Sequence, residues 1–209
     1  MMAIFEGMVG RSKALQDIIT FIIRVADEDD PVLIQGETGT GKELIAKAIH
    51  NQSVRKDEPF VVVDCSNMLP IMKGSMLFGQ EETAFPGAAA YKGKLETVRN
   101  GTLFLDHVDA LYRGLQEMLI PVMKEKRFGP IGGKADIPLR ARIVSATNED
   151  LAHLVSQGGF IPGLYSQLKE LYMEVPPLRE RKEDIPLLVD HFIRENWNRK
   201  KRGPKGISE

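Results

Sequence analysis

Residues 31–43, which read PVLIQGETGTGKE, decide the fold of this chain. An apolar stretch from Val32 to Ile34 runs into a glycine-rich turn, and a helical segment from about Lys42 to His50 follows. The turn fits the pattern G-x-x-x-x-G-K, whose glycines let backbone N–H groups point at phosphates while the lysine neutralises them. A strand before the pattern and a helix after it are the context in which it binds phosphate. The residues expected to bind nucleotide here are Gly36, Glu37, Thr38, Gly39, Thr40, Gly41, Lys42 and Glu43.

The bulk composition is that of an ordinary globular protein. The 209 residues can form one large domain, or one small domain and part of a second, with 43% hydrophobic and 27% charged residues. No apolar run approaches the ~20 residues that cross a bilayer, and the N-terminus lacks signal-peptide architecture. The single cysteine, Cys65, lies in an apolar run and excludes a disulfide within the chain. We therefore expect a reducing, cytoplasmic location and no membrane partner.

The charge distribution gives no general attraction to nucleic acid. The formal net charge is −1, and the main basic cluster is Arg199 to Lys205 near the C-terminus. Because no helix-turn-helix pattern accompanies this cluster, a solvated helix end explains it better than a DNA contact. We therefore expect contact with DNA only through a domain that is not in this chain.

The alternation of apolar strands and amphipathic helices predicts a parallel sheet covered by helices on both faces. The predicted strands are 32–34, 60–64, 102–105 and 140–146. The predicted helices are 12–26, 42–50, 111–124, 151–156, 164–171 and 184–197. Residues 67–92, rich in Gly, Ala, Met and Pro, predict a broken helix and a projecting loop.

A change of character near residue 176 suggests two subdomains. Residues 1–176 are expected to form the α/β nucleotide-binding subdomain, and 177–209 the beginning of a truncated helical lid. Phe192 and Trp197 are expected in the lid core. His50, His153 and His191 lack metal-ligand spacing and are interpreted as surface or helix-end residues.

Polar side chains follow two of the predicted strands at the edge of the sheet where ligands bind. Asp106 ends the strand GTLFLD (101–106) with a carboxylate suited to Mg²⁺, and Asn148 fits a polar sensor of the γ-phosphate. Capping of the next helix is the alternative role of Asn148. The residue after Asp106 is His107, where a nucleotide hydrolase usually has a carboxylate. An imidazole can accept a proton but brings no negative charge that would orient water beside a metal.

Several motifs together resemble the AAA+ central domain of bacterial enhancer-binding proteins, the activators of sigma-54 RNA polymerase. They span essentially the whole chain: GMVG (7–10), GETGTGKE (36–43), PFVVVDC (59–65), LFG (77–79), GTLFLD (101–106), ATN (146–148) and PPLRERKEDIP (176–186). The resemblance implies an AAA+ P-loop fold with a helical lid, ATP or another purine nucleotide with Mg²⁺, and self-association into a dimer or ring. It also implies that residues 7–10, including Val9, close over adenine, and that the protein acts on sigma-54 promoter complexes.

The sequence departs from this family at the positions that the resemblance makes catalytic. His107 replaces the glutamate that polarises water, and Asp64 replaces the asparagine that restrains this glutamate. Ile161 and Gln167 replace two arginines that the family supplies to a neighbouring subunit, and such arginines contribute orders of magnitude to phosphoryl transfer. Arg140 and Arg142 remain open as substitutes.

The loop that contacts sigma factor in the family reads G-A-F-T-G-A there and TAFPGA at 83–88 here. The aromatic Phe85 is retained. Pro86 replaces the contacting threonine and removes a hydroxyl and a backbone donor, while Thr83 replaces a glycine and stiffens the loop. The segment 129–133 is a turn between a helix and a strand, or a second pore-facing loop.

The leading hypothesis is an AAA+ module of a sigma-54-type regulator that binds nucleotide and hydrolyses it poorly or not at all. One alternative is a functional ATPase that remodels sigma-54 promoter complexes with His107 as a weak base. Another is a module for a different nucleotide or protein partner, which Lys42 and Asp106 argue against.

Overall fold

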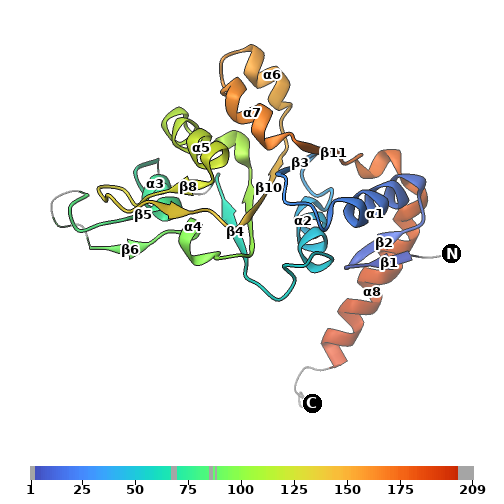
Figure 1. Ribbon diagram of the computed structural model, residues 1–209. Coiled ribbons are helices and arrows are strands. Elements are labelled where there is room, and N and C mark those ends of the chain that lie inside the picture. Colours follow the sequence, from blue (N-terminus) through green and yellow to red (C-terminus); the bar gives the residue numbers. More distant parts are fainter. Residues whose placement is uncertain (1–2, 67–69, 85–86, 88, 202–209) are drawn as a thin grey trace, which may run out of the picture.

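The computed structural model of the chain describes residues 3–66, 70–84, 87 and 89–201. Its centre is a five-stranded sheet in the order β11–β3–β10–β7–β4, in which every neighbouring pair of strands is parallel (Figure 1). The strands are β3 (Val32–Gln35), β4 (Phe60–Asp64), β7 (Thr102–Asp106), β10 (Arg142–Thr147) and β11 (Leu171–Glu174). The predicted parallel α/β architecture is confirmed.

Alternating side chains of the central strands supply two separate core layers. In β3, Val32 and Ile34 pack with one layer, whereas Leu33 belongs to the other. The first layer includes residues of α1 (Lys13–Val25) and α2 (Lys42–Asn51), and the second includes residues of α5 (Arg113–Glu125) and α7 (Pro162–Leu168). Because both faces are covered, the central strands are apolar almost throughout.

The remaining elements are short, apart from the last helix. They are β1 (Ala3–Phe5), β2 (Met8–Gly10), α3 (Pro70–Phe78), β5 (Gly79–Gln80), β6 (Tyr91–Lys92), α4 (Lys94–Thr97), η1 (Val108–Ala110), β8 (Arg127–Phe128), β9 (Ile137–Pro138), α6 (Leu151–Ser156), η2 (Leu178–Glu180), η3 (Lys182–Asp184) and α8 (Ile185–Lys201). The helix α8 lies beside α1 and the β1–β2 hairpin (Figure 1). No helix in the described part of the chain is long and apolar enough to cross a membrane.

One local prediction was wrong, and one short element was missed. The helix predicted over 164–171 ends at Leu168, and Leu171 instead begins β11, an edge strand that pairs with β3. The antiparallel β1–β2 hairpin at the N-terminus was not predicted. Both are strands of three or four residues, too short to show a clear period in the sequence.

The region predicted as a broken helix and a projecting loop contains α3, followed by the short strands β5 and β6. The strands β5 and β6 lie away from the central sheet (Figure 1). Phe85 and Pro86, predicted to contact a partner, lie outside the described residues. The proposed subdomain boundary at residue 176 falls between β11 and η2 and stays a prediction.

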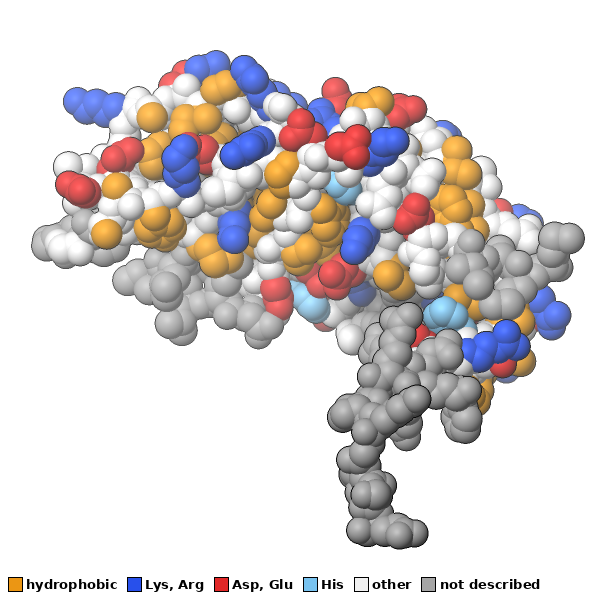
Figure 2. All heavy atoms as spheres, turned by 90° about the horizontal axis from the view of Figure 1, so that it is seen from below, with side chains coloured by type: hydrophobic (Ala, Val, Ile, Leu, Met, Phe, Trp, Pro, Cys, Tyr) orange, Lys and Arg blue, Asp and Glu red, His pale blue; other side chains and the backbone are white. Residues whose placement is uncertain are grey.

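Charge on the surface is mixed. Acidic and basic side chains are interspersed over the face that Figure 2 shows. This distribution agrees with the formal net charge of −1 for the whole chain.

Candidate nucleotide-binding site

The glycine-rich turn forms a loop between β3 and α2 at the carboxyl end of the sheet. Gly39 and Gly41 have φ angles of +80° and +98°, a left-handed conformation that favours glycine. The Thr40 hydroxyl donates a hydrogen bond of 2.8 Å to the Glu37 carbonyl and fixes the turn. Since α2 begins at Lys42, the first N–H groups of that helix, which have no intrahelical acceptor, face the loop.

The Lys42 side chain is 8% exposed and is held by three acceptors. Its Nζ donates to the carbonyls of Gly36 and Glu37 at 2.8 and 3.0 Å, and to Asn148 Oδ1 at 2.5 Å. Burial lowers the pKa of Lys42, while the charges of Asp106 and Asp109 act in the opposite direction. A partly desolvated ammonium group of this kind interacts strongly with an anion.

Most of the predicted site residues surround one cavity of about 330 Å³. The described residues that line it are Thr38, Gly39, Gly41, Lys42, Glu43, Leu44, Asp106, His107 and Asn148. Gly36 and Glu37 line a second cavity of about 590 Å³ together with Asn148. Thr40 and Val9 line a third cavity, of about 460 Å³. The structure thus brings the sequence-predicted residues to one region at the ends of β3, β7 and β10.

His107 lies between two carboxylates. Its Nδ1 atom is 3.5 Å from Asp106 Oδ2 and 3.6 Å from Asp64 Oδ1. Its backbone adopts a left-handed conformation (φ +52°), and its N–H donates to Asp106 Oδ1 at 2.9 Å. The position beside Asp106 therefore presents an imidazole to the cavity, with two acidic neighbours.

Asn148 does not cap the helix that follows it. The cap of α6 is Asp150, whose Oδ1 accepts hydrogen bonds from the N–H groups of Ala152 and His153 at 2.9 and 3.1 Å. Asn148 instead directs its side-chain oxygen to Lys42. The helix-capping interpretation of Asn148 was therefore wrong.

Of the two arginines left open as catalytic substitutes, Arg142 is buried at the opposite end of the sheet. It is 2% exposed and donates to the carbonyls of Ala26 and Asp30, at 2.9 and 3.2 Å. A side chain so enclosed cannot reach a neighbouring molecule. Arg140 is exposed, so it stays open as a substitute.

Ile161 and Gln167, which stand where the resemblance places two arginines, carry no positive charge. Ile161 caps the start of α7, with its N–H donating to Gln116 Oε1 at 2.8 Å, and its side chain packs against the core. Gln167 is half-buried, and its Oε1 atom is enclosed. Neither side chain can stabilise charge on a phosphate in the way that an arginine does.

The segment 129–133 lies against the projecting loop. It joins β8 to β9, so the interpretation as a turn between a helix and a strand was wrong. Ile131 exchanges backbone hydrogen bonds of 3.0 Å with Gly79 and Glu81, and the Thr83 hydroxyl donates to the Gly132 carbonyl at 3.0 Å. Thr83 thus anchors one end of the loop that contains Phe85 and Pro86.

The sequence did not reveal the residues that lid-side segments contribute to the cavity of about 460 Å³. These are Leu178, Arg181, Leu188, His191, Phe192 and Glu195. Phe192 is 55% exposed and lines this cavity rather than a lid core. His50, interpreted as a surface or helix-end residue, lies in the last turn of α2 but is buried. The motif PPLRERKEDIP (176–186) was the one sequence feature that pointed to this region, because it contains Arg181. It gives no indication of what the Arg181 side chain contacts.

A buried carboxylate holds the wall of this cavity together. Asp184, the last residue of η3 and directly before α8, accepts hydrogen bonds from the Arg11 N–H at 2.6 Å, the Ser12 N–H at 2.8 Å and the Ser12 hydroxyl at 2.6 Å. Burial alone raises the pKa of Asp184, but these hydrogen bonds outweigh it and hold the pKa below its usual value. The contact attaches the start of α8 to the segment between β2 and α1, two elements that also line this cavity.

A parallel sheet with a phosphate loop after β3, and a lysine, an aspartate and an asparagine at the carboxyl ends of its strands, is the arrangement of an AAA+ P-loop fold. The family model described as the sigma-54 interaction domain matches residues 8–174. The chain belongs to this family.

Known proteins with similar sequences are bacterial regulators. The Nif-specific regulatory protein of Herbaspirillum seropedicae is 42% identical over 189 residues, which cover 90% of this chain and 35% of that protein. The transcriptional regulatory protein ZraR of Salmonella typhimurium is 40% identical over 203 residues, covering 97% of this chain and 46% of that protein. The crystal structure of NtrX from Brucella abortus in complex with ATP has a TM-score of 0.86 and 33% identity, covering 96% of this chain and 46% of that one. The chain spans less than half the length of these relatives.

Proposed function

We propose that this chain is the ATP-binding module of a bacterial sigma-54-type transcriptional regulator, and that it hydrolyses ATP poorly or not at all. The main support for this proposal is the cavity of about 330 Å³, which is lined by the phosphate loop, Lys42, Asp106, His107 and Asn148. The similarity to NtrX, which was solved with ATP, supports nucleotide binding.

The side chains around the cavity fit a magnesium ion. Mg²⁺ is usually bound by one or two carboxylates together with phosphate oxygens and water, rather than by a complete set of protein ligands. Asp106 is the carboxylate at the end of β7, and Glu43 also lines the cavity. A complete set of protein ligands is not found: among the described residues, no three or more His, Cys, Asp or Glu side chains are grouped so that they could hold a metal ion. Phosphate oxygens and water would therefore supply the other ligands of Mg²⁺. Bound there, Mg²⁺ would neutralise the phosphate oxygens.

Weak hydrolysis follows from the groups that surround the phosphate position. A water molecule attacking the γ-phosphate needs a base, and His107 provides an imidazole beside Asp64 and Asp106 instead of a carboxylate. The α7 positions Ile161 and Gln167 offer no positive charge to a neighbouring subunit. ATP then acts as a ligand that sets the conformation or the oligomeric state.

The partners of the full-length protein follow from the family. We propose self-association into a dimer or ring, DNA contact through another domain, and a cytoplasmic location. Contact with sigma-54 RNA polymerase would involve the loop with Phe85 and Pro86. Retention of Lys42, Asp106 and Asn148 favours a second candidate function, an active ATPase that remodels sigma-54 promoter complexes.

Titration calorimetry with ATP and Mg²⁺ tests the binding proposal. Lys42→Ala should weaken binding by at least tenfold, about 1.4 kcal/mol, because the variant lacks the ammonium group beside the phosphates. The matched control is Lys47→Ala, an exposed lysine on the same helix, which should bind like the wild type. Equal affinities of wild type and Lys42→Ala would contradict the proposal.

Turnover measurements separate the two candidate functions. The wild type should hydrolyse ATP far below the ~1 s⁻¹ of working enzymes, and His107→Glu alone should change this little because arginines are still missing. Open-complex formation at a sigma-54 promoter by the full-length protein, lost in Phe85→Ala, would establish the active ATPase instead.

A further inference from the structure

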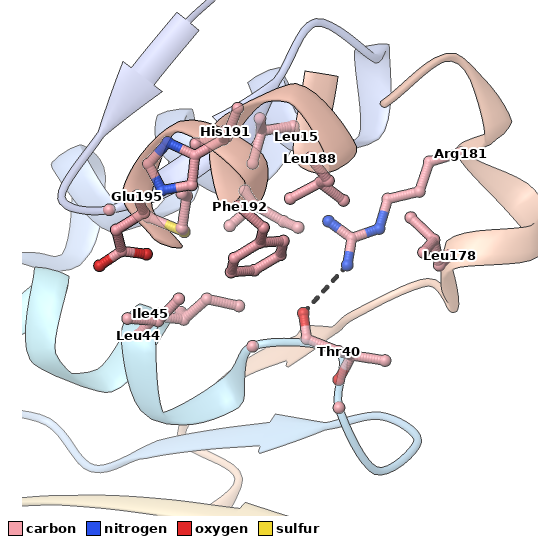
Figure 3. Close-up of a pocket in the computed structure, with 16 residues that line it drawn as sticks. Leu15, Thr40, Leu44, Ile45, Leu178, Arg181, Leu188, His191, Phe192 and Glu195 are labelled. Carbon is pink, nitrogen blue, oxygen red and sulfur yellow. Dashed lines mark hydrogen bonds between the residues drawn. The ribbon is translucent and has the colours of Figure 1, made fainter. Parts of the chain in front are cut away.

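The cavity of about 460 Å³ beside the phosphate loop has opposite charges at its two ends. Arg181 lies at one end, next to the phosphate loop, and Glu195 lies at the other, with Phe192 between them (Figure 3). The walls between the ends are mostly apolar, with Leu15, Leu44, Ile45, Leu178 and Leu188 among the lining residues. This inference rests on the proposed function, because it assigns the cavity of about 460 Å³ to the base of a nucleotide whose phosphates occupy the cavity of about 330 Å³.

The positive end is attached to the phosphate loop. Arg181 Nη2 donates a hydrogen bond of 3.0 Å to the carbonyl of Thr40. A triphosphate on the loop between Gly36 and Lys42 would therefore leave the base to extend into the apolar part of the cavity, away from Arg181. Electrostatic attraction favours this orientation, since the phosphates carry the negative charge of a nucleotide.

The negative end is built into α8. Leu188, His191, Phe192 and Glu195 follow one another at intervals of three and four residues, so they share one face of the helix. The face that places Leu188 and Phe192 on the cavity therefore places Glu195 there as well. Asp184 fixes α8 against the N-terminal segment, which gives this face a defined position.

We propose that Glu195 selects purine nucleotides that carry a 6-amino group. An ionised carboxylate accepts hydrogen bonds but donates none. The amino group of adenine is a donor and can pair with it, whereas a 6-oxo group would place two acceptors against each other. The apolar walls bind any purine, so the discrimination between purines comes from Glu195.

The test compares ATP with purine riboside triphosphate, which lacks only the 6-amino group, in magnesium buffer by titration calorimetry. The wild type should bind ATP about fivefold more tightly, the size expected for a hydrogen bond to a partly exposed charged group. Glu195→Leu should reduce this preference to within twofold while leaving the affinity for purine riboside triphosphate unchanged. The unchanged affinity shows that the variant is folded.

The matched control is Asp190→Leu, an acid on the same helix that pairs with Arg194 at 2.8 Å and does not line the cavity. It should keep the fivefold preference. A wild type without preference, or a preference that persists in Glu195→Leu, would overturn the inference while leaving nucleotide binding intact. Failure of both nucleotides to bind would overturn the proposed function, and this inference with it.

Discussion

The two ends of the parallel sheet use the same kinds of charged side chain for different purposes. At the amino ends of the strands, the guanidinium groups of Arg142 and Arg55 donate to backbone carbonyls, and Arg55 also pairs with Asp29 at 2.6 Å. At the carboxyl ends, Lys42 and Asp106 line a cavity of about 330 Å³. The amino end is closed by its own backbone, whereas the carboxyl end is open to a ligand.

This difference predicts where substitutions act. A cation whose hydrogen-bond acceptors are buried carbonyls contributes to the free energy of unfolding, since its removal leaves these acceptors unsatisfied. A cation that lines a cavity contributes to ligand affinity, as Lys42 does even though its Nζ also donates to the carbonyls of Gly36 and Glu37. Charge alone therefore does not identify the functional end of this sheet. The cavity that Lys42 and Asp106 line does.

The largest expected effect on stability is at Arg142. Arg142→Met should lower the free energy of unfolding by about 3 kcal/mol, because it removes a buried cation and its hydrogen bonds to the buried carbonyl of Ala26 and the part-buried carbonyl of Asp30. ATP affinity of the folded variant should not change. Urea unfolding and calorimetry measure the two quantities. Arg140→Met, at an exposed position two residues away, is the control and should match the wild type in stability.

Asp184 is a fully buried charge close to the candidate site, so its substitution should affect both stability and ligand affinity. Asp184→Asn should lower the free energy of unfolding by about 2 kcal/mol near neutral pH, because an amide offers one acceptor where Arg11 and Ser12 present three donors. ATP affinity should fall as well, because α8 loses its attachment. A variant with normal stability would show that these hydrogen bonds contribute little.

The same residue predicts a pH dependence. The pKa of Asp184 lies below its ordinary value of 3.8 in the folded protein, so folding favours the ionised form. Its stabilisation is complete above 3.8 and is lost as the pH falls through the lower folded value. The difference between wild type and Asp184→Asn should therefore shrink in acid, which urea unfolding at neutral and acidic pH would measure.

Asp184 also shows which parts of the molecule the sequence could predict. The central strands are recognisable because each is an unbroken apolar run, and the phosphate loop because its pattern is local. The contact between Asp184 and Ser12 joins residues 172 positions apart, and no periodicity indicates it. Arg181 and Glu195 likewise reach the candidate site through contacts between distant parts of the chain, such as the hydrogen bond from Arg181 to Thr40. The sequence motif therefore marked the region of Arg181 but not its role.

The short strand β11 was missed for a different reason. Its four residues, Leu171 to Glu174, follow α7 after a gap of two residues, and Leu171 continues the apolar spacing of that helix. Pairing with β3 decides the conformation of this segment, and that partner lies more than 130 residues earlier. Tertiary pairing of this kind overrides local preference.

A smaller effect is expected at His50, at the closed end of the sheet. Its side chain is 4% exposed, and its Nδ1 is 2.9 Å from the Thr102 hydroxyl oxygen. Burial lowers the pKa of His50 below 6.5, so folding favours the neutral ring, and stability is lost as the pH falls through 6.5. His50→Gln should reduce the loss of stability between about pH 7.5 and 5.5, and the exposed His153→Gln should not. Equal pH dependence of wild type and His50→Gln would contradict this.

The smallest expected effect is at an ion pair on the open end. Arg179 donates to both carboxylate oxygens of Glu37, a phosphate-loop residue, at 2.6 and 2.7 Å, and holds the pKa of Glu37 below its usual value. Both side chains are more than half exposed, so Arg179→Gln should leave the thermal midpoint unchanged. It should weaken ATP binding by about threefold at low salt, because the carboxylate left without its partner repels the phosphates.

Two further variants give this last prediction its controls. Arg127→Gln removes another exposed arginine, one that pairs with Asp136 at 2.6 Å, and it should leave ATP affinity unchanged. Adding Glu37→Gln to Arg179→Gln should restore the affinity, because it removes the repelling charge. Salt should also reduce the effect, since the screening length is about 10 Å at 0.1 M. If the double variant still binds weakly, Arg179 contacts the nucleotide itself, and η2 is part of the nucleotide-binding site.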